Sequence, residues 1–237
     1  MLEIKNLTRK YLSRAAVDGV TLTVEPGKTY ALLGPNGSGK TTLMKMIAGL
    51  TKPTSGEILF GGEQVGVSSK AKIAYMPTEN YFYNYMSIAD AGRYYADFFK
   101  DFDLEKFNEM LRRMDLNAKD KIRQLSSGMA AKVRLALTLC RDAELMMFDE
   151  PLNGVDILTR AQVVNEIVEN RASGRSMIIS THLVDELDPY IDYAIYMKHG
   201  VIEKMGSREE LCREDTLTGL YLKIYGQVSG TEGNQDA

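Results

Sequence analysis

A glycine-rich segment, Gly34-Pro-Asn-Gly-Ser-Gly-Lys-Thr41, constrains the fold of this chain more than any other feature. It fits the pattern G-x-x-x-x-G-K-[ST] at every fixed position. The apolar residues 29–33 before it predict a buried strand, and apolar residues at helical spacing predict a helix over about 40–49. A plain turn between strand and helix is disfavoured because the pattern and its context agree. The segment therefore predicts a loop that wraps a phosphate group.

The physical chemistry of phosphate binding explains these residue types. Glycines let backbone N–H groups turn inward around a β-phosphate, and the following helix N-terminus adds partial positive charge. Lys40 is expected to reach β- and γ-oxygens, Thr41 to ligate Mg²⁺ through its hydroxyl, and Thr42 to donate to the α-phosphate. The loop alone does not distinguish a kinase, a GTPase and an ATPase. The predicted nucleotide-binding residues here are Gly34, Pro35, Asn36, Gly37, Ser38, Gly39, Lys40, Thr41 and Thr42.

Two acids follow a second apolar segment. Residues 145–148 are wholly apolar and end at Asp149 and Glu150, as is typical of a central parallel strand with acids at its C-terminal tip. Asp149 is expected to hold Mg²⁺ through water, and Glu150 to polarise an attacking water. Solvated acids at an ordinary strand end are the alternative, which the phosphate-binding pattern makes minor.

The base of the nucleotide is less well specified by the sequence. Nothing resembles the N-K-x-D motif that reads guanine in GTPases. Tyr11 lies before the first predicted hairpin, where its ring could stack on adenine, and such stacking tolerates different bases. A surface tyrosine that packs on the hairpin is the competing interpretation.

The remaining periodicities predict the fold class. Alternating apolar residues indicate strands at 2–7 and 17–24, with further strands at 73–76 and 176–180 and a closing hairpin at 193–205. Aromatic residues at helical spacing indicate a helical insertion. The prediction is an α/β fold: a P-loop NTPase core, with a mostly parallel sheet flanked by helices, an N-terminal antiparallel β-subdomain and a small helical subdomain. We expect one domain over 1–228, the helical subdomain inserted at about 79–125, and a disordered tail at 229–237.

Composition narrows the class of partner. The formal net charge is −3 and the pI about 5.6, so no nucleic acid partner is expected. No stretch approaches the ~18 apolar residues that a membrane-spanning helix needs, so a role at a membrane would require another chain. Cys140 and Cys212 have no second cysteine at metal-ligand spacing and are predicted to be reduced, buried thiols.

Three further motifs resemble those of one family. Leu125-Ser126-Ser127-Gly128-Met129 resembles the LSGGQ signature of ABC-type ATPases, with its first, second and fourth positions matched. Asn153-Gly154-Val155-Asp156 resembles the family's D-loop, and Thr181-His182 its switch histidine. Tyr11 falls where the family has its adenine-stacking aromatic. The resemblance covers residues 2–210 and keeps the family's order of motifs.

This resemblance implies a mechanism. Two copies would sandwich two ATP molecules head to tail, with Ser126, Ser127 and Gly128 of one copy closing over the γ-phosphate held by Lys40 of the other. It also implies that Glu150 is the catalytic base, that His182 contacts the γ-phosphate and orients the water, and that Asp156 bridges to the opposite loop. From the residues alone, His182 could instead be a buried histidine with satisfied hydrogen bonds.

The sequence departs from the family pattern twice. Many members carry a glutamine that links Mg²⁺ to the helical subdomain, where this chain has Pro77-Thr78-Glu79. Thr78 aligns best as the metal ligand but is short, and Glu79 could serve instead. Met129 replaces the last glutamine of the signature, and a signature that ends in Gly-Met resembles those of bacterial exporter subunits.

The features together favour the ATP-binding and ATP-hydrolysing subunit of an ABC-type exporter. Integral-membrane permease subunits and a second ATPase subunit, identical or different, are the expected partners. The expected location is cytoplasmic, on the inner face of the cell membrane through the permease. Tyr81-Phe-Tyr-Asn-Tyr85-Met86 either presents an aromatic surface to a permease helix or forms the core of the insertion. The alternative is a soluble ABC-type ATPase with a non-transport role such as cluster assembly.

Overall fold

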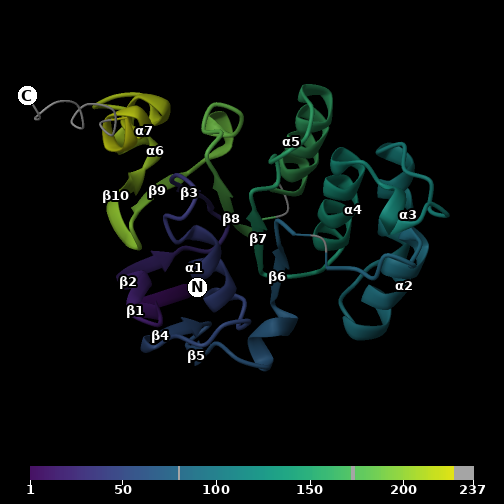
Figure 1. The fold of residues 1–237 in the computed structure, drawn as a ribbon, viewed down its shortest axis with the longest axis horizontal. Coiled ribbons are helices and arrows are strands. Elements are labelled where there is room, and N and C mark those ends of the chain that lie inside the picture. The colour runs from purple at the N-terminus through teal and green to yellow at the C-terminus, as the bar shows by residue number, and fades with distance from the viewer. Residues whose placement is uncertain (80, 172–173, 227–237) are drawn as a thin grey trace, which may run out of the picture.

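The computed structural model describes residues 1–79, 81–171 and 174–226 (Figure 1). Two sheets organise them. The antiparallel sheet has the strand order β2-β1-β4-β5, and the larger sheet has the order β10-β9-β3-β8-β7-β6. In the larger sheet every neighbouring pair is parallel except β9 and β10. The predicted fold class, including the closing hairpin, is confirmed.

The strands of the antiparallel sheet are β1 (Leu2–Tyr11), β2 (Arg14–Val24), β4 (Ser55–Phe60) and β5 (Glu63–Gln64). Those of the larger sheet are β3 (Thr29–Leu33), β6 (Ile73–Met76), β7 (Leu145–Asp149), β8 (Ser176–Thr181), β9 (Tyr193–Lys198) and β10 (Val201–Ser207). The helices are α1 (Lys40–Ile47), α2 (Ile88–Phe98), α3 (Leu104–Arg113), α4 (Ser127–Leu139), α5 (Ile157–Arg171), α6 (Arg208–Leu211) and α7 (Leu217–Tyr225), with 3₁₀ turns at Ser68–Ala71, Ile122–Gln124 and Asp188–Tyr190.

Strands β1 and β2 are longer than the sequence predicts. Their pairing shifts register between Ile4 and Leu7, again between Leu7 and Arg9, and again at Lys10. Each irregularity interrupts the period-two alternation of buried and exposed side chains. Sequence reasoning therefore ended the first strand at residue 7, whereas it continues to Tyr11.

Two hydrophobic clusters cover the two faces of the larger sheet. In β3, Tyr30 and Leu32 belong to the cluster beneath the antiparallel sheet and α1, and Ala31 and Leu33 belong to the cluster beneath α4 and α5. Successive side chains of a strand point to opposite faces, so both faces of β3 are buried. The neighbouring strands β7 and β8 are buried in the same way, which gives the C-terminal tips of these three strands a rigid base.

The inserted helices α2 and α3 contact each other and α4. A capping box at Ser87 starts α2, because the Ser87 hydroxyl accepts from Asp90 N–H and the Asp90 carboxylate accepts from Ser87 N–H. Arg141 fastens the insertion to the core: it contacts Asp101 at 2.6 Å and donates to the carbonyl oxygen of Lys70. The domain and subdomain limits stay a prediction, and the expected tail at 229–237 lies outside the described residues.

The aromatic segment of the insertion divides between the two interpretations. Phe82 and Met86 pack against the core, while Tyr83 and Tyr85 are 60% and 69% exposed. The segment therefore contributes to the insertion's core and also presents an aromatic surface.

Some features differ from the sequence expectations or were absent from them. Helices α5 and α7 were not predicted; in α5, the first-turn residues Ile157 and Leu158 are exposed and obscure the amphipathic pattern. Cys140 is buried as expected, but Cys212 is exposed because it follows the short surface helix α6. Within the described ranges, no helix is both long and apolar enough to cross a membrane.

Candidate active site

The glycine-rich loop joins β3 to α1 in a conformation that side chains would block. Gly34, Gly37 and Gly39 have φ angles of 155°, 80° and 108°. A Cβ atom on Gly39 would lie 2.4 Å from the carbonyl oxygen of Ala16 in the neighbouring hairpin. Only glycine tolerates this close approach. The β-subdomain therefore contacts the loop backbone directly and restricts its conformation.

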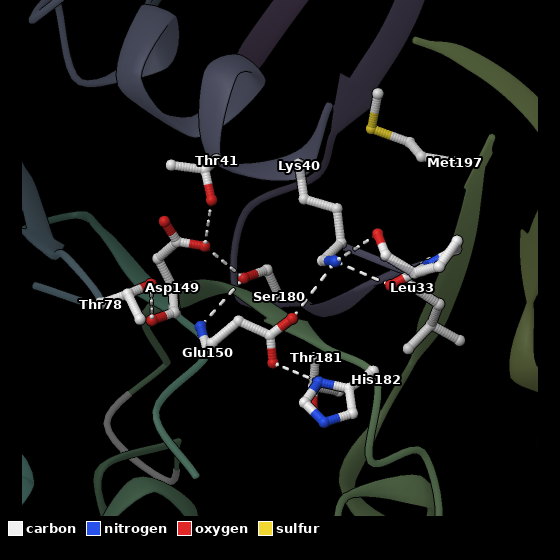
Figure 2. Close-up of polar contacts among 12 residues, drawn as sticks. Leu33, Lys40, Thr41, Thr78, Asp149, Glu150, Ser180, Thr181, His182 and Met197 are labelled. Atoms are coloured by element: carbon white, nitrogen blue, oxygen red, sulfur yellow. Dashed lines mark hydrogen bonds and ion pairs between the residues drawn. The ribbon is translucent and has the colours of Figure 1, made fainter. Parts of the chain in front are cut away.

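Lys40 connects the loop to Glu150, which follows β7, and through Glu150 to His182, which follows β8. Its Nζ donates to the carbonyl oxygens of Gly34 at 2.7 Å and Pro35 at 3.2 Å, and lies 3.2 Å from Glu150 Oε1. The other carboxylate oxygen of Glu150 is 2.9 Å from His182 Nδ1 (Figure 2). Lys40 and Glu150 are almost fully buried, whereas His182 is about one-third exposed. These three side chains form one continuous polar chain.

Asp149 sits at the centre of a hydroxyl cluster and is fully buried. Its Oδ1 accepts from Ser180 Oγ at 2.6 Å and Thr41 Oγ1 at 3.1 Å, and its Oδ2 accepts from the Tyr75 hydroxyl at 3.1 Å (Figure 2). Burial, together with the Asp149 charge, raises the pKa of Tyr75, so Tyr75 stays protonated as a donor. The Thr78 hydroxyl donates to the main-chain carbonyl of Asp149 at 3.0 Å.

Glu150 has a left-handed backbone conformation with φ 49°, which is uncommon for a residue other than glycine. Its N–H is held at 3.0 Å from Ser180 Oγ and 3.1 Å from Ser180 O. Strained backbone of this kind persists where surrounding contacts fix it, and it concentrates at functional sites. Here it turns the carboxylate away from the strand and toward Lys40 and His182.

A cavity of about 590 Å³ opens over the loop, a size typical of small-molecule sites. Arg14, Ala15, Ala16 and His199 also line the cavity, and sequence reasoning missed them because no motif contains them. Asn153, the first residue of the D-loop-like motif, lines it as well, although no role at the site was predicted for it. Of the predicted site residues, the cavity is lined by Tyr11, Asn36, Gly37, Ser38, Gly39, Lys40, Thr41, Thr42, Thr78 and Glu150.

Tyr11 ends β1 at the rim of this cavity and is 48% exposed. The guanidinium carbon of Arg9 lies 4.6 Å from the centroid of its ring. One face of the ring is thus occupied by a cation–π contact. Adenine stacking on Tyr11 stays a prediction.

The signature residues do not line this cavity. Ser126 is the N-cap of α4 and accepts from Met129 N–H, and both Ser126 and Ser127 are exposed. A Cβ on Gly128 would meet the Thr159 hydroxyl at 3.2 Å, so Gly128 allows α4 to approach α5. Ser126 and Ser127 therefore present the N-terminus of α4 to solvent, while Gly128 is buried against α5.

Asp156, which was expected to bridge to a second subunit, is the cap of its own helix. Its carboxylate accepts from Thr159 N–H at 3.0 Å and from Thr159 Oγ1 at 2.7 Å. These hydrogen bonds, the hydroxyl first, lower the pKa of Asp156. Asp156 thus has an intrachain role in this structure, beside Gly128 of the signature.

Sequence reasoning also missed Ser180 and Tyr75, although both belong to predicted strands. Ser180 precedes Thr181-His182, so a polar residue inside an apolar strand was an available signal. Tyr75 gave none, because an aromatic residue in a strand is ordinary.

A phosphate-binding loop, adjacent strand-tip acids and a histidine bonded to the second acid define a P-loop ATPase cassette. Comparison with known proteins gives the family. The sequence profile described as ABC transporter matches residues 17–153, and the chain belongs to this family.

Two relatives and one solved structure illustrate the similarity. The ABC transporter ATP-binding protein YtrB of Bacillus subtilis (strain 168) is 30% identical over 230 residues, which cover 94% of this chain and 76% of YtrB. The lantibiotic transport ATP-binding protein SrtF of Streptococcus pyogenes is 32% identical over 205 residues, covering 85% of this chain and 89% of SrtF. A solved ATP-binding subunit of an ABC transporter superposes with a TM-score of 0.85 at 25% identity, covering 94% of this chain and 99% of that one. The predicted identity as an ATP-binding protein of the ABC transporter kind is confirmed.

Proposed function

We propose that this chain hydrolyses ATP in a Mg²⁺-dependent reaction that drives the separate permease subunits of an exporter. The observation that carries the proposal is the polar chain Lys40–Glu150–His182, whose two buried members, Lys40 and Glu150, line the cavity. A lysine at the phosphate loop, a carboxylate next to it and an orienting histidine are the groups that phosphoryl transfer to water requires.

The loop supplies the phosphate site. Residues 36–42 of the loop line the cavity at the start of α1, where main-chain N–H groups and the helix N-terminus attract anions. In this structure Lys40 donates to loop carbonyls and pairs with Glu150. We infer that a bound triphosphate draws Lys40 toward its oxygens and thereby frees the Glu150 carboxylate to act as a base.

The donor set beside the loop fits Mg²⁺. Thr41 Oγ1 and Asp149 Oδ1 are hard oxygen donors and lie 3.1 Å apart. The described residues contain no cluster of three or more His, Cys, Asp or Glu side chains that could hold a metal, in keeping with an ion that takes its other ligands from phosphates and water. Thr41 and Asp149 would hold the ion, with Thr78 placed by its bond to the Asp149 carbonyl. Bound Mg²⁺ would neutralise charge on the β- and γ-phosphates.

Glu150 is the proposed general base. Its carboxylate would accept a proton from the water that attacks the γ-phosphorus, and His182 at 2.9 Å would hold that carboxylate in place and contact the γ-phosphate. Ser180 fixes the Glu150 backbone from the adjacent strand. Proton acceptance and orientation thus come from two neighbouring strands of one rigid sheet.

A second ATPase subunit, identical or different, would complete the site. The N-terminus of α4, with the exposed Ser126 and Ser127 and the buried Gly128, does not line the cavity of its own chain. Its hydroxyls and free N–H groups suit the γ-phosphate of an ATP held by the partner. Asp156, beside Gly128, would reach the opposite loop only by giving up its contacts with Thr159.

Two observations support the transport role. The relative SrtF is named for lantibiotic transport, and the exposed Tyr83 and Tyr85 rings of the insertion offer a surface for a permease. Through such a permease the chain would lie on the cytoplasmic face of the membrane. Purification from detergent-solubilised membranes at native expression tests this: a co-purifying multi-span protein supports the role, and its absence favours a non-transport ATPase.

Replacing Glu150 with Gln tests the catalytic assignment. The amide keeps the shape of the side chain but cannot accept the proton, so we expect hydrolysis to slow by about 10²- to 10⁴-fold while MgATP binding persists. Glu144→Gln is the matched control, because Glu144 is an exposed glutamate paired with Lys72 on the surface. Phosphate release by the Glu150→Gln variant at the rate of the Glu144→Gln variant would exclude Glu150 as the base.

A further inference from the structure

The last described helix of the chain contacts the beginning of the phosphate loop. Helix α7 (Leu217–Tyr225) lies beside strand β9 (Figure 1), and the hydroxyl of its final residue, Tyr225, reaches the carbonyl oxygen of Leu33 at 3.2 Å, across 192 positions of sequence. Leu33 ends β3 and directly precedes Gly34. The same hydroxyl is 2.8 Å from the carbonyl oxygen of Met197 in β9.

The Met197 carbonyl also lies directly against the first residue of the loop. A Cβ atom on Gly34 would lie only 2.4 Å from it, and 2.7 Å from Ser38 Oγ. Gly34 is therefore held between these two groups, and its own carbonyl accepts from Lys40 at 2.7 Å. Leu33, Met197 and Lys40 accordingly appear together in the close-up of the site (Figure 2). A shift of the Met197 carbonyl would displace the Gly34 peptide.

Tyr225 itself is firmly placed. Its ring lies 4.5 Å from the ring of Tyr221, one helical turn earlier. Lys198 Nζ donates to the Ile224 carbonyl at 3.0 Å, which satisfies a free acceptor at the C-terminal end of α7. Burial raises the pKa of the Tyr225 phenol, so it remains a hydrogen-bond donor throughout the physiological range.

We propose that Tyr225 is a positioning residue for nucleotide binding: its hydroxyl ties the ends of β3 and β9 together and thereby holds Gly34 in the conformation that accepts the β-phosphate. Helix α7 then stabilises the conformation of the phosphate loop and also packs against the hydrophobic core. The inference rests on the proposed ATP binding at this loop. Tyr225 acts through two main-chain carbonyls and need not touch the nucleotide itself.

The chain provides a matched control at the other end of the same helix. Tyr196, which is fully buried, donates its hydroxyl to the Leu217 carbonyl at 2.9 Å. Tyr196→Phe and Tyr225→Phe therefore each remove one tyrosine hydroxyl that fastens α7, from the Leu217 carbonyl in the first case and from the Leu33 and Met197 carbonyls in the second. Only the Tyr225 bond involves carbonyls at the loop. A merely structural role of Tyr225 predicts that both variants behave alike.

The test measures MgADP and MgATP binding by calorimetry, and thermal unfolding, for the wild-type chain and both variants. We expect Tyr225→Phe to raise the Kd of both nucleotides about fivefold to tenfold, the effect of losing one hydrogen bond, because both carry the β-phosphate. Tyr196→Phe should stay within about twofold of wild type, at a similar loss of Tm. In steady-state hydrolysis, Tyr225→Phe should raise KM with little change in kcat.

Three outcomes would overturn the inference. Unchanged nucleotide affinity in Tyr225→Phe would exclude a positioning role while leaving the proposed function intact. Equal weakening in both variants would show that α7 attachment in general, rather than Tyr225, sets the affinity. Failure of the wild-type chain to bind MgATP would overturn the proposed function and this inference with it. If Tyr225→Phe does not fold, Tyr225→Met provides the same comparison, since it also lacks the hydroxyl and keeps an apolar side chain.

Discussion

The ion pair between Lys40 and Glu150 leads to a prediction about the stability of the nucleotide-free protein. The side chains of the two residues are only 5% and 9% exposed, and their charged atoms are 3.2 Å apart. Glu150 Oε1 is buried and accepts no hydrogen bond among the described residues, so the Lys40 ammonium is what compensates its charge. Lys40→Met keeps an apolar stem of similar length but leaves that carboxylate oxygen without a cation.

The magnitude follows from the burial of the pair. Breaking a buried ion pair by removing one partner costs roughly 3–5 kcal/mol, and because the cavity admits water we expect the lower limit, about 3 kcal/mol. For a domain of this size that corresponds to a fall in Tm of about 6–12 °C. The double variant Lys40→Met/Glu150→Gln should recover at least ~1.5 kcal/mol, because a neutral amide requires no cation.

The assay is urea unfolding without nucleotide, followed by far-ultraviolet circular dichroism because the chain has no tryptophan. The double-variant cycle gives the coupling between the two residues. Lys40→Met with wild-type stability, to within about 0.5 kcal/mol, would contradict the reasoning. A double variant that is no more stable than Lys40→Met would also contradict the reasoning. The stability lost in Lys40→Met would then come from packing or loop contacts and not from the uncompensated charge.

Two further predictions concern the helical insertion. Asp90 accepts hydrogen bonds from Ser87 N–H and the Ser87 hydroxyl, which lower its pKa to about 2. Asp90→Asn should therefore reduce the free energy of unfolding near neutral pH. The difference from wild type should shrink as the pH falls from about 4 toward 2, where wild-type Asp90 becomes protonated. A pH-independent difference in urea midpoint would refute this. Arg141 is 3% exposed and pairs with Asp101, so Arg141→Met should lower the free energy of unfolding by about 3 kcal/mol, measured by urea unfolding. Arg93→Met is the control: Arg93 forms an exposed pair with Asp90, and its loss should cost less than about 1 kcal/mol. Equal losses in these two variants would show that the Arg141 contact does not fasten the insertion.

The phosphate loop and the acids could be predicted because each depends on residues adjacent in sequence. The loop pattern fixes its own turn through glycines, and the flanking periodicities announce a strand and a helix. Asp149 and Glu150 follow directly from the end of an apolar strand. Short-range sterics and apolar patterning decide such features, and both can be read along the chain.

The partners of these residues could not be predicted in the same way. Lys40, Glu150 and His182 meet because β3, β8 and β7 are neighbours in the sheet, although their sequence order is different. Tyr75 and Ser180 reach Asp149 from the two strands that flank β7. Nothing in a local pattern states which strands pair.

The sequence by itself determined the class of the protein, the phosphate-binding loop and the identity of its principal charged residues. Only the tertiary structure decided that Lys40 pairs with Glu150, that Asp156 caps its own helix, and that Tyr225 contacts the start of the loop. The physical reason is that the backbone conformation of a short motif restricts which residues can occupy it, so the motif can be recognised along the chain. Contacts between distant segments depend instead on strand order and on how both faces of the sheet are covered.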